Sequence, residues 1–137
     1  LEYPIGQSHG QHVNPICLPS ANSTIPEDGQ VIATGFGAWN NRSIANNING
    51  GGTTPLLETV FPLIPRDVCS KRLRGNMRLK TILDIQLCGG SHGHGTAPGD
   101  SGGPLLMKTE NGQWYHVGIT SFGNNSIAGL HQQDVLP

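Results

Sequence analysis

The sequence predicts an all-β protein built as an antiparallel barrel or sandwich. The chain has 137 residues, with 20 Gly and 10 Pro but only 12% charged residues, a balance typical of turn-rich β structure. Its β-prone runs are short and separated by turn signals, and no internal repeat is present. Only one short segment has helical features.

The first part of the chain alternates one strand with irregular segments. Residues 1–30 contain four prolines, so we expect an extended connector without a helix. Residues 31–36 (Val-Ile-Ala-Thr-Gly-Phe) are β-prone and predict a strand. Residues 38–55 are rich in Asn and Gly, which predicts a long loop of the kind that is usually functional or mobile.

The middle part predicts two strands around a short helix. Leu56 to Ile64 is expected to be a strand. Pro65 then begins a helical segment that ends near Arg74, because proline is well tolerated in the first turn of a helix. Ile82 to Cys88 predicts a further strand.

The last part predicts a large turn followed by a hairpin. Residues 89–103 are Gly-rich and are expected to form the turn. Pro104 to Met107 and Trp114 to Phe122 are predicted strands joined around Asn111-Gly112, a strong hairpin signal. No strand is predicted after Phe122.

Charge and hydropathy exclude several classes of partner. The net charge of -1 gives no reason to expect nucleic acid or an anionic membrane surface. No apolar run approaches the ~20 residues of a membrane span. Leu1 opens directly into polar sequence, so we expect no signal peptide and a fragment of a longer chain. We expect no cofactor.

The cysteines and the glycosylation sequons indicate the cellular compartment of the protein. Cys17, Cys69 and Cys88 make an odd count, which in a secreted chain indicates a partner elsewhere. The alternative is three buried thiols in a cytosolic protein. Three Asn-x-Ser/Thr sequons at Asn22, Asn41 and Asn124 favour an extracellular glycoprotein.

One motif carries chemistry, and it lies in the Gly-rich turn. Its residues are Gly99-Asp100-Ser101-Gly102-Gly103-Pro104-Leu105. The motif resembles the nucleophile segment of the chymotrypsin-like serine proteases, the trypsin family. Other segments at residues 13–19, 34–37, 87–90 and 121–123 resemble the same family.

The resemblance covers about residues 12–123 and implies a fold. It implies the C-terminal, six-stranded-type antiparallel barrel of a two-barrel trypsin-like fold, in incomplete form. Residues 1–28 would be the inter-barrel connector and residues 29–123 the second barrel. Residues 124–137 would be a divergent or truncated tail.

The resemblance also implies a mechanism of peptide-bond hydrolysis through an acyl-enzyme. Ser101 would be the nucleophile, and a serine hydroxyl needs a base to remove its proton. The backbone N–H groups of Gly99 and Ser101 would form the oxyanion hole that stabilises the tetrahedral intermediate. Asp100 would accept a salt bridge from the amine released by zymogen cleavage.

The specificity pocket follows from the same resemblance. Gly95 would lie at its floor without the negative charge that selects Lys or Arg, and Gly123 would leave its wall open. Ser121 and Gly123 would bind an extended protein or peptide substrate by strand addition. We therefore expect cleavage after apolar or aromatic residues.

The cysteines acquire roles by resemblance. Cys69 and Cys88 would form a disulfide, and Cys17 would bridge to a propeptide or light chain outside this sequence. The family's disulfide in the turn before the nucleophile has no counterpart, because Ala97 occupies its position.

The catalytic His and Asp of the family have no recognisable segment here. None of the six His, at positions 9, 12, 92, 94, 116 and 131, has a family-like context. We expect the fragment to lack the N-terminal barrel and to be inactive alone.

Three alternative readings remain. The first is a non-catalytic protease homologue that acts as a binding or regulatory module on the same fold. The second is an α/β-hydrolase, whose Gly-x-Ser-x-Gly pattern is satisfied at residues 99–103, although its nucleophile precedes a helix and here Pro104 and a hairpin follow. The third is a metal site at His92 and His94, for which two ligands are too few.

Overall fold

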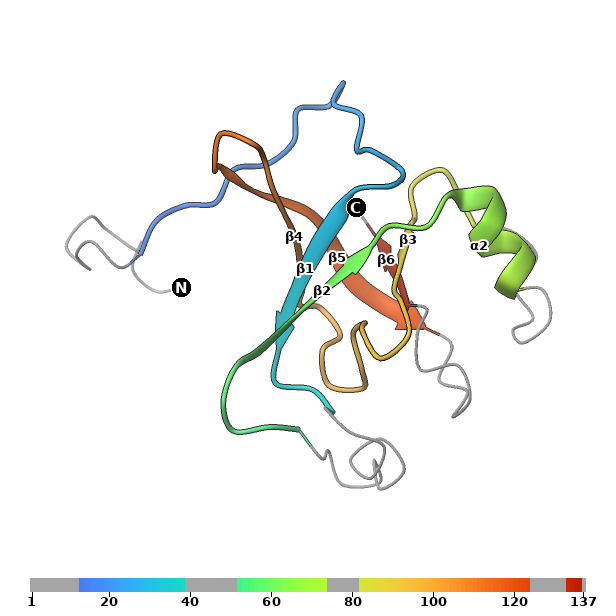
Figure 1. Cartoon of the computed structure of the whole chain (residues 1–137). Coiled ribbons are helices and arrows are strands. Elements are labelled where there is room, and N and C mark those ends of the chain that lie inside the picture. The colour runs from blue at the N-terminus through green and yellow to red at the C-terminus, as the bar shows by residue number, and fades with distance from the viewer. Residues whose placement is uncertain (1–12, 39–51, 74–81, 124–132, 137) are drawn as a thin grey trace.

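The computed structural model describes residues 13–38, 52–73, 82–123 and 133–136 and is predominantly β (Figure 1). Its elements, in chain order, are β1 (Gln30–Gly35), β2 (Leu57–Pro62), α2 (Arg66–Leu73), β3 (Leu87–Gly89), β4 (Pro104–Lys108), β5 (Trp114–Gly123) and β6 (Gln133–Leu136). The predicted all-β class is confirmed.

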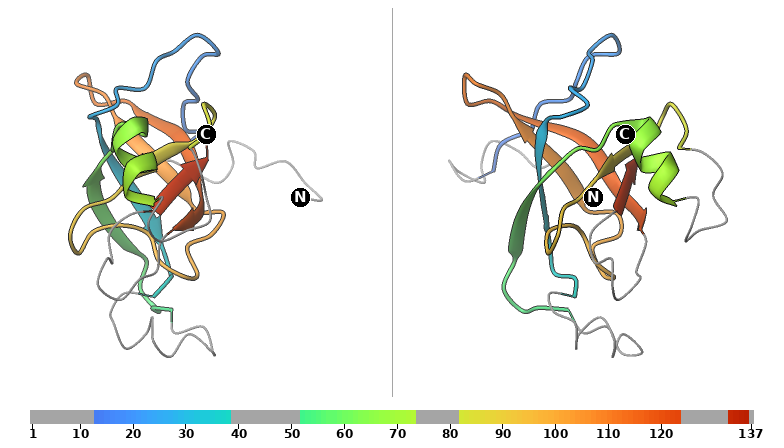
Figure 2. Two further views of the ribbon diagram at one scale, coloured as in Figure 1. Left: turned by 90° about the vertical axis from the view of Figure 1, so that its right-hand side faces the viewer. Right: turned by 45° about the vertical axis from the view of Figure 1, so that its right-hand side comes forward.

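The described strands form one curled antiparallel sheet in the order β2-β1-β4-β5-β6-β3. Next to the β2 edge, Ala33 of β1 pairs with Thr59 on one side and Leu105 on the other. The strands cross at steep angles rather than lying flat (Figures 1 and 2). An isolated antiparallel bridge joins Leu63 to Gly89, so the two edges of the sheet meet at one point. This is the arrangement expected of an incomplete trypsin-like barrel.

The core lies inside this curl and follows from the period of two along each strand. Val31 and Ala33 alternate with more exposed neighbours on β1, and Phe61 faces them from β2. Leu105 of β4 and Val117 of β5 complete the contact. Val31, Phe61 and Leu105 are the largest of these side chains and are almost fully buried, so they contribute most of the apolar area that holds the barrel together.

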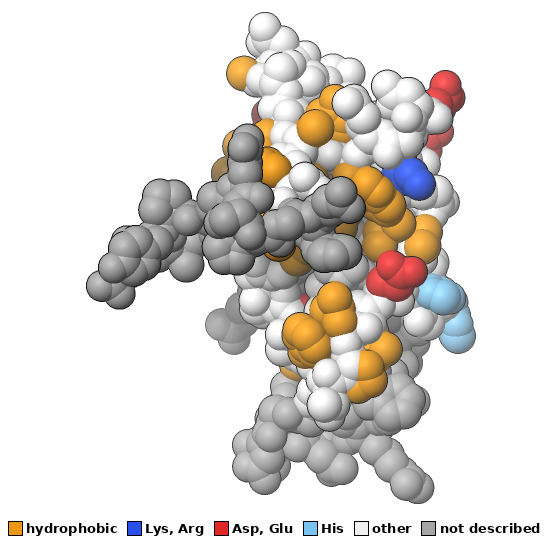
Figure 3. Space-filling model, turned by 90° about the vertical axis from the view of Figure 1, so that its left-hand side faces the viewer, with side chains coloured by type: hydrophobic (Ala, Val, Ile, Leu, Met, Phe, Trp, Pro, Cys, Tyr) orange, Lys and Arg blue, Asp and Glu red, His pale blue; other side chains and the backbone are white. Residues whose placement is uncertain are grey.

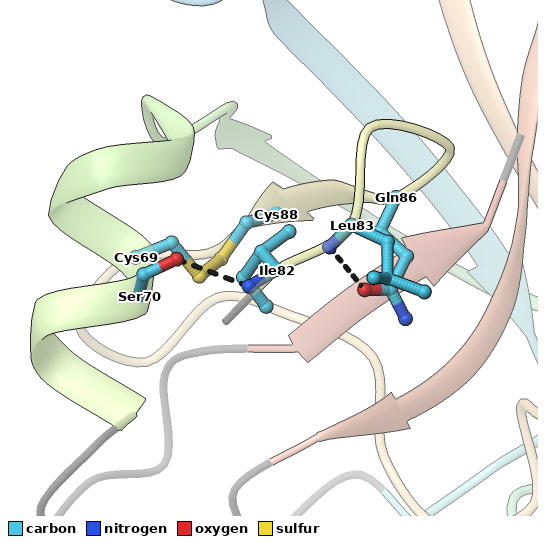
Figure 4. The surroundings of a disulfide bond; sticks show 6 residues. All are labelled: Cys69, Ser70, Ile82, Leu83, Gln86 and Cys88. Atoms are coloured by element: carbon cyan, nitrogen blue, oxygen red, sulfur yellow. Dashed lines mark hydrogen bonds between the residues drawn. A yellow bond between two sulfur atoms is a disulfide. The ribbon is translucent and has the colours of Figure 1, made fainter. Parts of the chain in front are cut away.

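A second, smaller cluster holds α2 against β3. Ile64, Ile82 and the disulfide between Cys69 and Cys88 form it. Figure 4 shows the cysteines between the helix and the strand, and the amide of Ile82 donating a hydrogen bond of 3.1 Å to the hydroxyl of Ser70. The predicted Cys69–Cys88 pairing is confirmed.

The sequence of α2 explains its bounds. Pro65 precedes its first residue, where the missing N–H costs nothing. Asp67 in the first turn and Lys71 in the last turn both complement the helix dipole, and their side chains pair at 3.1 Å. The hydrogen bond from Lys71 is the main cause that holds the pKa of Asp67 below its ordinary value.

Replacing Cys69 and Cys88 together by alanine is expected to lower the free energy of unfolding by about 3 kcal/mol. The bond closes a loop with a sequence separation of 19 residues, and the entropy of the unfolded chain rises when that loop is opened. Urea unfolding followed by circular dichroism measures the change. Cys17→Ala is the matched control, since Cys17 is exposed and unbonded; an equal loss from Cys17→Ala would contradict the prediction.

Two elements differ from the sequence prediction. The strand expected from Ile82 begins only at Leu87, because residues 83–86 form a turn in which the Gln86 side chain accepts the amide of Leu83. β6 was not predicted, yet it pairs with both β5 and β3. The hairpin around Asn111-Gly112 is confirmed, with Gly112 at a φ of 85°.

The connector runs extended along the start of β5. Residues 13–29 contain no helix, as predicted. The amide of Cys17 donates to the carbonyl of Trp114 at 3.3 Å, and the amide of His116 donates to the carbonyl of Cys17 at 2.9 Å. These bonds fix the connector to the barrel.

Large apolar side chains remain on the surface of the described structure, and Figure 3 shows groups of them on one face. The exposed residues are Val13, Ile16, Leu18, Phe36, Leu56, Leu57, Val60, Leu83, Ile85, Trp114 and Ile119. No helix in the described ranges is long and apolar enough to cross a membrane.

Candidate active site

Ser101 lies in the Gly-rich segment between β3 and β4, in a turn at the surface. Its side chain is exposed. The amide of Gly102 donates to the carbonyl of Thr120, and the amide of Thr120 donates to the carbonyl of Gly103, both at 2.9 Å. Gly102 has a φ of 81°, a conformation that glycine adopts without strain. The turn is therefore bonded to β5 while the hydroxyl stays accessible.

The two amides that were predicted to form an oxyanion hole, those of Gly99 and Ser101, have no described acceptor. Gly99 has a φ of 101°, which again requires glycine. Among the described residues, none accepts a hydrogen bond from the N–H of Gly99 or Ser101. Neither amide is therefore bonded within the part of the chain that the structure describes.

The side chain of Asp100 is half-buried, whereas that of Ser101 is exposed. Oδ1 of Asp100 accepts a hydrogen bond from the amide of Gly37 at 2.8 Å, and Oδ2 accepts one from the amide of Ala97 at 2.9 Å. The carboxylate thus bonds to the turn that follows β1. The salt bridge to a new N-terminal amine stays a prediction.

The predicted pocket residues come from two elements. Gly95 lies in the loop after β3 and is half-buried, and a Cβ placed on it would meet no heavy atom within 4 Å. Ser121 and Gly123 lie at the end of β5, where a register shift between Thr120 and Phe122 interrupts the pairing with β6. Their roles in binding stay predictions.

Thr96, Gly35 and Gly37 were not predicted as site residues. Thr96 is 5% exposed, and its hydroxyl is buried without a partner in the described structure. Gly35 and Gly37 lie directly against the carboxylate of Asp100. The Thr-Gly-Phe-Gly segment at residues 34–37 indicated only a family resemblance. Its contact with Asp100 could not be predicted, because Gly37 and Asp100 are 63 residues apart in the sequence.

Among the described residues, no histidine ring is seen to form a hydrogen bond with the hydroxyl of Ser101. Nδ1 of His94 pairs with the hydroxyl of Thr59 at 3.2 Å, on an exposed turn that also carries His92. His116 lies at the seam between β5 and the connector, with its Nε2 buried and unpartnered. His9, His12 and His131 are outside the described residues. The structure gathers no group of three metal-ligating side chains within the ranges it describes.

The remaining predicted sites fall on the connector or outside the described ranges. Cys17 is exposed and unbonded, so its interchain bridge stays a prediction. Asn22 is exposed in a turn of the connector, where a glycan would fit without displacing the core. Asn41 and Asn124 lie outside the described residues.

The comparison with protein families agrees with the fold and the motif. Residues 5–134 match the family model described as Trypsin. The chain belongs to the trypsin family of serine proteases. The match includes the connector from residue 5 onward, the nucleophile turn and the first two residues of β6.

Several trypsin-family proteins are similar to this chain. A tryptase of Mus musculus is 33% identical over 116 residues, covering 82% of this chain and 40% of the relative. The serine proteinase stubble of Drosophila melanogaster is 35% identical over 127 residues, covering 90% of this chain and 15% of the relative. Chymotrypsin-C of Rattus norvegicus is 31% identical over 122 residues, covering 88% of this chain and 41% of the relative. The chain therefore spans less than half the length of each of these relatives.

Proposed function

We propose that this trypsin-family chain carries the nucleophile of a serine endopeptidase, and that the nucleophile is Ser101. The observation that carries the proposal is the turn at residues 99–101. An exposed hydroxyl lies in a turn bonded to β5, and the amides of Gly99 and Ser101 have no described acceptor. Open amides beside an exposed hydroxyl suit acyl transfer, since that chemistry needs both groups.

The proposed reaction begins when the hydroxyl oxygen of Ser101 attacks the carbonyl carbon of a peptide bond. A general base takes the hydroxyl proton, and the N–H groups of Gly99 and Ser101 stabilise the negative oxygen of the tetrahedral intermediate. The C–N bond then breaks, and the leaving amine takes the proton. A water molecule then attacks the acyl carbon while the base takes a proton from it. The bond to the Ser101 oxygen breaks, and that oxygen regains the proton from the base.

The base and its orienting carboxylate are proposed to come from polypeptide outside this chain. The ring of His94 bonds to Thr59, His116 lies between β5 and the connector, and no His of the sequence has a family-like context. Without a base the serine hydroxyl is a weak nucleophile. We therefore propose that the chain by itself has almost no peptidase activity.

We propose protein or peptide substrates that are cut after an apolar or aromatic residue. Gly95 places no charge at the proposed floor, and its Cβ position is open. An extended substrate would pair with the backbone of Ser121 and Gly123 at the end of β5.

The proposal includes a secreted zymogen with a second barrel. The exposed apolar residues of the connector and β5 would pack against that barrel, which would remove them from water. Cys17 would pair with a propeptide cysteine, and Asp100 would respond to the amine released by activation. Secretion is supported by the disulfide between Cys69 and Cys88, since such bonds persist in oxidising compartments.

Fluorophosphonate labelling of the full-length, activated protein tests the proposal. We expect one covalent adduct on the peptide that contains Ser101, and no adduct on the isolated 137-residue chain, which lacks the base. An activated protein that is folded but unlabelled would contradict the proposed endopeptidase activity and would favour a non-catalytic homologue. Labelling at another serine would overturn the assignment of Ser101.

A further inference from the structure

We infer that Gly35, the last residue of β1, and Gly37, in the turn that follows β1, position Ser101 by forming a cradle for the carboxylate of Asp100. The inference rests on the proposed role of Ser101 as the nucleophile. It assigns a positioning function to two residues that touch neither substrate nor the reacting hydroxyl. We call Gly35, Gly37 and the Asp100 carboxylate the aspartate cradle.

The space around the carboxylate is the first observation. A Cβ on Gly37 would lie 2.5 Å from Oδ1 of Asp100, and a Cβ on Gly35 would lie closer still to the same atom. Separations under 3.0 Å do not occur for real Cβ atoms. The carboxylate therefore occupies the volume that any other residue at either position would fill.

Backbone conformation does not explain these two glycines. Positive φ angles occur at Gly99, Gly102 and Gly112, but at neither Gly35 nor Gly37. An alanine could adopt the backbone of Gly35 or Gly37 without strain. What excludes a side chain at both positions is the contact with Asp100.

The cradle is linked to Ser101 through short bonds. The amide of Gly37 donates to Oδ1 at 2.8 Å, and the next amide, of Ala38, donates to the carbonyl of Pro98 at 2.9 Å. Oδ2 accepts the amide of Ala97, so the turn at residues 97–100 closes on its own carboxylate. A Cβ on Gly99 would be 3.0 Å from Cα of Gly37, so the two turns lie in direct contact.

No disulfide of this chain shares that task. Of its three cysteines, Cys69 and Cys88 are bonded to each other, and Cys17 is exposed on the connector. The turn that carries Ser101 is thus held to the turn after β1 by hydrogen bonds and packing alone. A methyl group at residue 37 would push the carboxylate away and shift Ser101 with it.

The test compares Gly37→Ala, Asp100→Ala, the double variant and Gly112→Ala in the full-length activated protein. Gly37→Ala is expected to slow fluorophosphonate labelling of Ser101 by about a hundredfold, the effect of a displacement near 1 Å in an active site. In the Asp100→Ala background the same change should add less than about twofold, because two residues that act through one contact are not additive.

Gly112→Ala is the matched control. It disturbs a glycine with a φ of 85° and open space around it, so it destabilises the hairpin without touching the cradle. Its labelling rate should stay within about twofold of wild type. Full additivity of Gly37→Ala and Asp100→Ala, or an equal loss in Gly112→Ala, would overturn the inference.

Hydrogen exchange separates this inference from the proposed function. Gly37→Ala should accelerate exchange of the amides of Ala97 and Gly103, whose acceptors belong to Asp100, and Gly112→Ala should not. If the wild-type protein shows no labelling but the exchange rates follow this pattern, the aspartate cradle is supported and the proposed endopeptidase activity is contradicted. Wild-type exchange at both amides in Gly37→Ala would overturn the cradle whatever the activity.

Discussion

Replacing Ser101 by alanine in the full-length activated protein is expected to lower kcat/KM for peptide hydrolysis by about 10⁶-fold. The hydroxyl is the atom that bonds to the substrate carbon, so no acyl-enzyme forms without it. The N–H groups of Gly99 and residue 101 remain, and they keep the small residual rate that an oxyanion hole supplies. Initial rates with a chromogenic peptide ester and amide measure the loss.

Ser20→Ala is the control for this variant. Ser20 is exposed on the connector, and its hydroxyl pairs with that of Ser23 at 2.8 Å. We expect its kcat/KM to equal that of wild type. A Ser101→Ala protein that retains a tenth or more of wild-type activity would show that another residue is the nucleophile.

Replacing Phe61 by alanine is expected to lower the free energy of unfolding by about 3–5 kcal/mol. Phe61 is 1% exposed and joins the β1–β2 pair to the core. Its ring also fills the space beside Gly89, where an added Cβ would lie 2.9 Å from the ring. Removing it leaves a cavity bordered by two strands that pair with other elements and cannot collapse freely.

The neighbouring residue provides the comparison. Val60 precedes Phe61 on the same strand but is 49% exposed. Val60→Ala should therefore change the free energy of unfolding by about 0.5 kcal/mol or less. Urea unfolding of both variants gives the two values. Equal losses at positions 60 and 61 would mean that the face of β2 described by the structure is not the buried one.

The strands that could be predicted are those in which short-range patterns and tertiary pairing agree. β1, β2 and the β4–β5 hairpin were predicted to within one or two residues, because β-branched runs are bounded by strong turn signals. β3 was predicted too long, since Ile82 packs on the disulfide cluster instead of continuing a strand. β6 was not predicted, because its own residues do not form a recognisable strand pattern. It is a strand because it pairs with β3 and β5.

The candidate site divides in the same way. Ser101 and its glycines could be identified because the whole motif is contiguous, and the positive φ angles of Gly99 and Gly102 are ones that glycine adopts without strain. The partners of Asp100 could not, because Gly37 lies 63 residues away in the sequence. A pattern of residue types does not state which distant amide will face a carboxylate.

The sequence alone therefore determined the β class, the family resemblance, the disulfide pair and the position of the candidate nucleophile. The β class and the nucleophile motif depend on residue identity and local spacing, whereas the disulfide pair was implied by the family resemblance. Only the tertiary structure decided that the turn after β1 meets the turn before Ser101, and that the last strand completes the sheet. Such contacts arise when the curled sheet brings remote segments together, since burial of the common core fixes their relative positions.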